Sequence, residues 1–287
     1  MGNELALVFF SSFVDLGCGL FIAMTINEWF GISEKIKVKG AILSLIILAI
    51  GGFSSVLHLG HPERIFGALG HPTSGIFLES SGIGVTAVCI LIYIYLLKQK
   101  SSTNAKKAVT LVGAVIAAIL AFAVGDSYVM AARPAWDTLT IPFVYLASAL
   151  LMGSLCYFAL LGSDNMQRLA AMKKWILLFV SVQAVAILAY LIALGSADYP
   201  DASRSVGIVL KGELAPLFWI AIVAIGLGVP AYAAIKNQNL PQNVAVAGGT
   251  SQSINFIFAI GLVCAFIGAL AYRVVMFNLG TPVWQFF

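Results

Sequence analysis

The chain has 287 residues, of which 61% are hydrophobic and only 10% are charged. This composition cannot cover the surface of a soluble globular protein, so it excludes that class and indicates an integral membrane protein. The formal net charge of +4 comes from basic residues gathered in loops, and it gives no argument for a nucleic-acid partner.

Apolar runs fill nearly the whole chain, and each is long enough to cross a bilayer as a helix. The sequence therefore predicts an all-α integral membrane protein with eight transmembrane helices. We expect a single polytopic membrane domain over residues 1–287, built as two four-helix bundles. A β-barrel is excluded, because runs such as AILSLIILAIGGF are apolar on every face. The predicted helices lie near residues 5–28, 38–57, 75–97, 108–130, 141–162, 174–195, 214–235 and 254–277.

The distribution of lysine and arginine predicts the orientation of the chain. Most of them lie in the loops after the first, third, fifth and seventh predicted helices, and such loops face the cytoplasm. Both termini are therefore expected outside. The residues on the inner side are Lys35, Lys37, Lys39, Lys98, Lys100, Lys106, Lys107, Arg168, Lys173, Lys174 and Lys236, against Arg64, Arg133, Arg204, Lys211 and Arg273 outside.

Polar residues inside predicted helices need an explanation, because a polar side chain within the bilayer is expensive. Asp15 and Gln183 lie deep. Asp15 could belong to a proton path, but a single deep acid supports interhelical hydrogen bonding better than it supports a pump. Asp126, near the outer end of the fourth helix, could serve a binding pocket or pair with Arg273.

The loop between the second and third helices contains every histidine of the chain: His58, His61 and His71. Because they share one loop, they cannot clamp a haem between facing helices. Their spacing does not match a zinc protease, and His61 and His71 precede prolines, which is typical of turns. His58 differs because it ends an apolar helix near the outer interface, a position that suits proton exchange with water.

Glu79 lies a few residues into the third predicted helix. An unpaired carboxylate facing lipid is costly, so its side chain should face protein or water. Two interpretations remain open. Glu79 and His58 could share or relay protons near the outer surface, or Glu79 could pair with Arg64 or Arg133 and hold the loop.

The four cysteines do not form a cofactor motif. They stand singly in four different helices, without a CxxC pair, so we predict neither an iron–sulfur cluster nor a disulfide framework. The interpretation is that they are small buried side chains in helix packing. They are Cys18, Cys89, Cys156 and Cys264.

Two segments resemble a known family. HLGHPERIFGALGHPTSGIFLE (58–79) and DSYVMAARPAWDTLTIPFVYLASALLMG (126–153) are similar to the HLG, TSW and RPAW motifs of the membrane-anchor subunits of the dimethyl sulfoxide reductase family, the DmsC-like anchors. Eight helices with outside termini also match that family. The chain departs from the motifs at His61, Gly75, Phe77, Leu78 and Asp137.

The resemblance implies a specific function. Such anchors oxidise a quinol, typically menaquinol, bind no haem or iron–sulfur cluster themselves, and pass electrons to an iron–sulfur subunit with 4Fe-4S clusters and a molybdopterin catalytic subunit. By position, His58 and Glu79 match the family's quinol-site histidine and glutamate, and Arg64 and Arg133 match its motif arginines. The implied location is the inner membrane of a bacterium or archaeon.

The resulting hypothesis places a quinol head group at the outer ends of the second, third and fourth helices. His58 and Glu79 would accept its protons, and quinol oxidation would occur only within the complex. Tyr128, Arg133, Trp136 and Asp126 could complete the pocket, or the first three could anchor the loop or the interface. The alternatives are a secondary transporter, which would show a repeat and a mid-depth site, and a purely structural anchor, with residues 196–213 as a docking surface.

Overall fold

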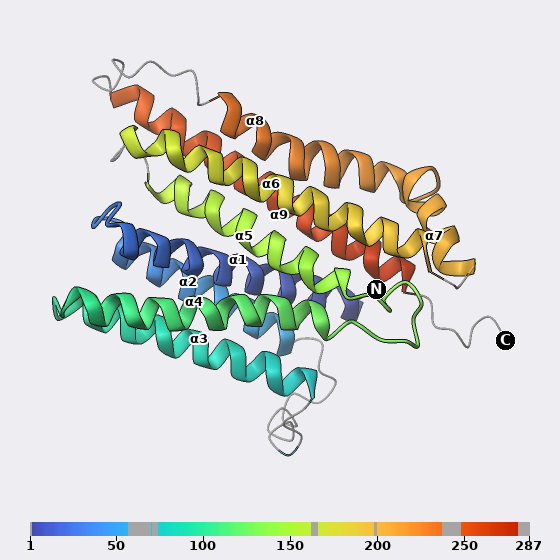
Figure 1. Ribbon diagram of the computed structural model, residues 1–287, viewed down its shortest axis with the longest axis horizontal. Helices are drawn as coiled ribbons and strands as arrows, with labels where there is room; N and C mark the ends of the chain where they lie inside the picture. Colours follow the sequence, from blue (N-terminus) through green and yellow to red (C-terminus); the bar gives the residue numbers. More distant parts are fainter. Residues whose placement is uncertain are drawn as a thin grey trace.

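A computed structural model describes residues 2–56, 70, 74–161, 166–197, 200–236 and 248–280. These residues contain helices and no strand. The helices are α1 (Gly2–Phe30), α2 (Lys37–Val56), α3 (Gly75–Lys98), α4 (Thr103–Asp126), α5 (Thr140–Leu161), α6 (Met166–Gly195), α7 (Pro200–Leu210), η2 (Leu217–Gly228), α8 (Val229–Lys236) and α9 (Gly248–Leu279) (Figure 1).

The predicted membrane spans are confirmed, because eight described helices are long and apolar enough to cross a bilayer. α4 differs most from its prediction of 108–130. It begins at Thr103, after Ser102 caps its first turn by accepting from the Ala105 N–H, and it ends at Asp126. Tyr128 therefore lies beyond the helix. The seventh span runs through η2 and α8, and η2 is a π-helix, a form that usually occurs as a single turn.

The segment 196–213, expected as a loop, contains the short helix α7. Ser205 and Val209 of α7 are buried and Ile208 is exposed, so α7 has one packed face and one exposed face. It lies at the end of the molecule where α6 ends and η2 begins (Figure 1).

The spanning helices lie side by side with their axes roughly aligned (Figure 1). α1 packs against α2, α4 and α5, while α5 also packs against α6 and α9. α1 and α5 are consequently the most deeply buried spans. The expected grouping into two four-helix bundles stays a prediction, as does the placement of the termini outside.

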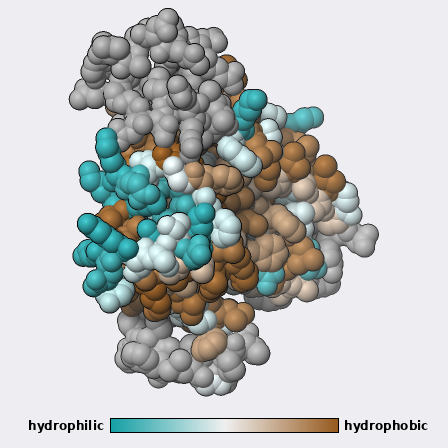
Figure 2. Space-filling model, turned by 60° about the vertical axis from the view of Figure 1, so that its left-hand side comes forward, coloured by the Kyte–Doolittle hydropathy of each residue, from teal (hydrophilic) through white to brown (hydrophobic). Residues whose placement is uncertain are grey.

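The two ends of the molecule differ in charge. The turns from α1 to α2 and from α3 to α4 form one end, on the left of Figure 1, which we call the basic end. Hydrophilic side chains gather there beside a hydrophobic flank (Figure 2). The start of α1, the segment between α4 and α5, and the end of α9 lie at the other, distal end (Figure 1). The basic end carries exposed Lys35, Lys39, Lys98 and Lys100.

α1 and α5 approach each other through glycine. A Cβ atom on Gly19 would lie 1.8 Å from the carbonyl oxygen of Ala149, and one on Gly153 would lie 2.0 Å from the carbonyl carbon of Gly19. No side chain fits between these backbones. Small residues at such crossings are the usual means by which membrane helices pack closely.

We expect Gly153→Leu to destabilise the protein by about 3 kcal/mol or more, the upper end of overpacking costs, because α1 and α5 must separate. The measurement is the thermal unfolding midpoint of the purified protein in detergent. Gly84→Leu is the matched control, because Gly84 lies in α3 with nothing within 4 Å of an added Cβ. An equal midpoint for both variants would contradict the close crossing.

Candidate functional site

Glu79 lies one turn into α3 and faces the end of α4. The helix begins at Gly75, after Ser74 accepts a hydrogen bond from the Phe77 N–H at 3.3 Å. The half-buried Glu79 carboxyl interacts with the hydroxyl of Ser127, the C-cap residue of α4. A Cβ on Gly75 would lie 3.3 Å from Ser127, so the close approach of α3 to α4 begins there. Of the two surroundings expected for Glu79, protein or water, the end of α4 provides protein.

The alternative in which Glu79 pairs with Arg133 is wrong. Arg133 donates from Nη1 to the Gly280 carbonyl at 2.8 Å, and its guanidinium lies 4.3 Å from the centre of the Trp136 ring. No ion pair joins Arg133 to Glu79, both of which the structure describes. Among the described residues, the polar group that interacts with the Glu79 carboxyl is the Ser127 hydroxyl.

Tyr128 lies directly after α4 in an aromatic cluster. Its ring is 5.9 Å from Trp136, 5.8 Å from Tyr145 and 5.4 Å from Phe277, measured between ring centres. Burial raises the pKa of the Tyr128 phenol well above its usual range, and the nearby Tyr145 and Glu79 add to the effect. The phenol therefore keeps its proton and acts as a hydrogen-bond donor.

Arg133 and Trp136 fix the segment between α4 and α5 to the end of α9. The Trp136 indole N–H donates to the Met276 carbonyl at 2.8 Å, and Arg133 reaches Gly280 as described above. Trp136 is buried at 4% exposure. Both residues therefore anchor the loop, which is one of the roles that the sequence left open for them, and Trp136 also packs against Tyr128.

A buried ion pair lies behind this cluster. Arg273 of α9 pairs with Asp15 of α1, and both are buried. Arg273 also donates to the Ser11 hydroxyl at 2.7 Å and lies 4.2 Å from the centre of the Tyr145 ring. Ser11 in turn interacts with the hydroxyls of Tyr128 and Tyr145. The prediction of an interhelical contact for Asp15 is confirmed, but the proposed Asp126–Arg273 pair is wrong.

Asp126 is exposed at the last residue of α4. It makes no ion pair among the described residues. It lies at the distal end, one residue before Ser127, which interacts with Glu79.

A second polar cluster at the basic end was not anticipated from the sequence. Lys37 pairs with Glu28 at 2.8 Å, and the Tyr93 hydroxyl donates to Glu28 at 2.8 Å. All three side chains are buried. The signal was available, since Glu28 ends an apolar helix and Lys37 begins the next. This cluster ties α1, α2 and α3 together at the end opposite to Glu79.

The remaining predicted site residues, His58 and Arg64, lie outside the described residues, as do His61 and His71. Within the described ranges, no group of three or more histidine, cysteine or carboxylate side chains could hold a metal ion. Cys18, Cys89, Cys156 and Cys264 are free thiols in different helices.

Comparisons with known proteins identify the fold and the family. The structure of bd oxidase from Geobacillus thermodenitrificans is similar in fold, with a TM-score of 0.61 over 97% of this chain and 85% of that chain, at 10% sequence identity. No curated protein matches the chain in sequence. The family model "DMSO reductase anchor subunit (DmsC)" matches residues 1–199. With eight spanning helices and this match, the chain is a multi-pass membrane protein that belongs to the family of DMSO reductase anchor subunits.

Proposed function

We propose that this anchor subunit oxidises a quinol, with menaquinol as the first candidate, at a site beside Glu79 at the distal end. The observation that supports this most directly is the Glu79 carboxyl itself. It is half-buried inside an apolar span, it makes no ion pair with any described residue, and the protonated Tyr128 phenol lies nearby. An acid in this position inside a membrane protein serves function by default.

The proposed reaction releases two protons and two electrons from the quinol, which becomes a quinone. Glu79 accepts one proton, and His58 accepts the other, as its match to the family motif implies. The Tyr128 hydroxyl donates a hydrogen bond that holds a quinol oxygen, while Trp136 and Arg133 keep the wall of the pocket in place. Exposed Asp126 then takes protons toward water. Arg64 completes the pocket by motif match.

The electrons leave through partner subunits. We propose an iron–sulfur subunit with 4Fe-4S clusters that docks at the distal end and a molybdopterin catalytic subunit beyond it. The exposed face of α7 lies at this end and adds to the docking surface. The location we propose is the inner membrane of a bacterium or archaeon, with the distal end outside.

His58→Ala tests the assignment of the second proton acceptor. In the intact complex, we expect quinol-dependent turnover to fall by about 100-fold or more, because this is the usual rate contribution of a positioned base. Activity with a reduced dye, which delivers electrons to the soluble subunits directly, should persist.

His71→Ala is the matched control for this variant, because it changes a histidine of the same loop that the motif does not assign to the quinol. It should retain wild-type turnover. Normal quinol oxidation by His58→Ala would contradict the assignment. A quinol analogue that fails to bind the wild-type complex would contradict the whole proposal and leave a structural anchor or a transporter.

A further inference from the structure

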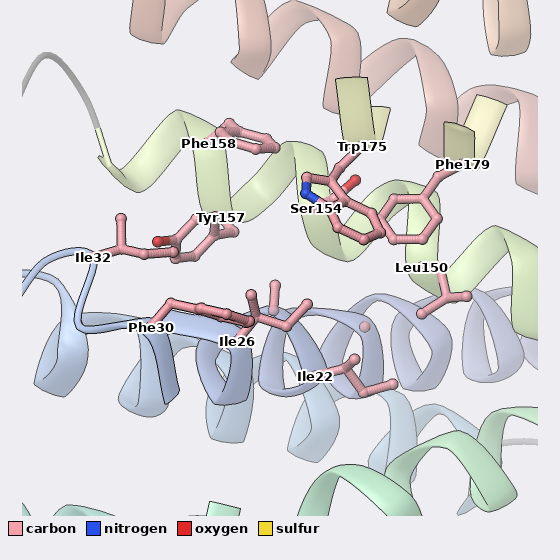
Figure 3. A pocket seen from close by; sticks show the side chains of 12 residues that line it. Ile22, Ile26, Phe30, Ile32, Leu150, Ser154, Tyr157, Phe158, Trp175 and Phe179 are labelled. Atoms are coloured by element: carbon pink, nitrogen blue, oxygen red, sulfur yellow. The ribbon is translucent and has the colours of Figure 1, made fainter. Parts of the chain in front are cut away.

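Two hydroxyl groups in an apolar groove between α1, α5 and α6 show how a hydroxyl inside the spans is satisfied (Figure 3). Ser154 donates to the Leu151 carbonyl at 2.8 Å, and Tyr157 donates to Asn27 at 2.9 Å. Each hydroxyl proton has an acceptor at hydrogen-bond distance. Ser11 of α1 differs, because a cation, backbone carbonyls and two phenols all interact with its fully buried hydroxyl.

The oxygen of Ser11 is fixed by Arg273 of α9. Nε of Arg273 donates to this oxygen at 2.7 Å, and the two residues are buried, at 0% and 1% exposure. The guanidinium is held in turn, because it pairs with Asp15 and because its Nη1 donates to the Ala269 carbonyl at 3.1 Å. The direction of the Ser11 O–H bond is what stays free.

The Ser11 hydroxyl has more acceptors around it than it can serve, because a serine hydroxyl carries a single proton. The Leu7 carbonyl is 2.9 Å away and the Val8 carbonyl is 3.3 Å away, both in the preceding turn of α1. The phenol hydroxyls of Tyr128 and Tyr145 also interact with Ser11. The direction of this O–H bond can therefore change with what binds nearby.

Tyr145 is held without Ser11, whereas the hydroxyl of Tyr128 is not. The Tyr145 hydroxyl donates to the sulfur of Met276 at 3.9 Å, and the Arg273 guanidinium lies 4.2 Å from the centre of the Tyr145 ring. The Tyr128 ring is fixed by its aromatic neighbours. Among the described residues, the polar group that interacts with the Tyr128 hydroxyl through a hydrogen bond is Ser11.

These contacts form a chain that can direct the Tyr128 hydroxyl. Arg273 donates to the Ser11 oxygen, Ser11 can donate to the Tyr128 oxygen, and the Tyr128 proton is then left for a quinol oxygen. Hydrogen bonds aligned in this way strengthen one another where the local dielectric is low. The charge of Arg273 is offset by Asp15, so the chain acts through direction and polarisation rather than through net charge.

We propose that Ser11 is a positioning residue of the quinol site, which donates to the Tyr128 oxygen when quinol is bound and so directs the Tyr128 hydroxyl at a quinol oxygen. Without quinol, the Ser11 proton turns to the Leu7 carbonyl. This inference rests on the proposed function, and it brings α1 into the quinol site.

Ser11→Ala in the intact complex tests the proposal, with menadiol as the quinol. The KM for menadiol should rise about fivefold at nearly unchanged kcat, because a hydrogen bond that supports binding is lost. A merely structural defect would instead lower kcat at unchanged KM, because fewer complexes would be active, and this result would overturn the proposal. Dye-linked activity of the same membranes measures the amount of assembled complex.

Ser12→Ala is the matched control. Ser12 is equally buried in the same turn of α1 and donates to the Val8 carbonyl at 2.8 Å, but among the described residues it bonds neither Arg273 nor Tyr128. This variant should keep the wild-type KM. Ser11→Cys keeps a side chain of similar shape with a weaker donor, so it should also raise KM, and it replaces Ser11→Ala where that variant does not fold.

A double variant shows whether Ser11 acts through Tyr128. Tyr128→Phe should raise KM, and Ser11→Ala added to it should raise KM no further, because the hydroxyl that Ser11 directs is gone. A further rise of about fivefold in the double variant, or a wild-type KM in Ser11→Ala, would overturn this inference. Inactive Glu79→Gln beside such a wild-type KM would leave the proposed function intact, whereas normal quinol oxidation by Glu79→Gln would overturn both.

Discussion

Glu79→Gln should abolish quinol-dependent turnover in the intact complex, with a loss of about 100-fold or more. Glutamine has the shape of glutamate and can keep the contact with Ser127, but its amide cannot accept the quinol proton. Dye-linked activity of the partner subunits should remain at the wild-type level, because that route bypasses the membrane site. The measurement compares the two assays on the same membranes.

Glu34→Gln is the control for this variant, because Glu34 is an exposed carboxylate at the basic end, opposite to the proposed pocket. It should leave both assays unchanged. A quinol analogue should still bind to Glu79→Gln, since the change alters proton transfer more than shape. Wild-type quinol oxidation by Glu79→Gln would remove the residue from the mechanism.

Arg273→Leu should destabilise the folded protein by about 3–5 kcal/mol, because it leaves the Asp15 carboxylate buried without its partner. Asp15→Leu alone should also destabilise, since it strands the guanidinium. The double variant Asp15→Leu with Arg273→Leu should lose far less, because no unpaired charge remains. Thermal or denaturant unfolding in detergent gives the three values.

The test compares the stability loss of the double variant with the sum of the losses of the two single variants. Additive losses in the double variant would show that Asp15 and Arg273 do not depend on each other. Lys211→Gln, at an exposed position of the distal end, is the control and should change stability by less than about 0.5 kcal/mol.

The membrane spans were predictable from the sequence because lipid leaves the backbone no alternative to helices, so each long apolar run must become one. Their ends depended on local chemistry. The end of α4 was placed at 130, but the helix stops at Asp126 and the chain turns through Ser127 to Tyr128. The π-helical form of η2 was not predictable, because its apolar composition is the same as that of an α-helix.

The site was predictable only in part. The cost of a charge in lipid correctly required that Glu79 face protein or water. The contact partners of the polar side chains could not be predicted, because the sequence does not give the register in which distant helices pack. Arg273 was one of two possible partners offered for Asp126, but it bonds Asp15, 258 positions away in the chain. Likewise, Arg133 turned toward Gly280 and not toward Glu79.

The loop after α4 is held by α9, so the first part of this subunit cannot be combined freely with the last part of another protein. The family pattern ends at residue 199, yet Met276, Phe277 and Gly280, which hold Trp136, Tyr128 and Arg133, come after it. In the proposed mechanism the reacting groups belong to the first 199 residues, whereas the residues that hold Tyr128, Arg133 and Trp136 belong to α9 and the residue that follows it. A chimera that joins residues 1–199 to an unrelated C-terminal half would keep every motif residue and lose the shape of the pocket.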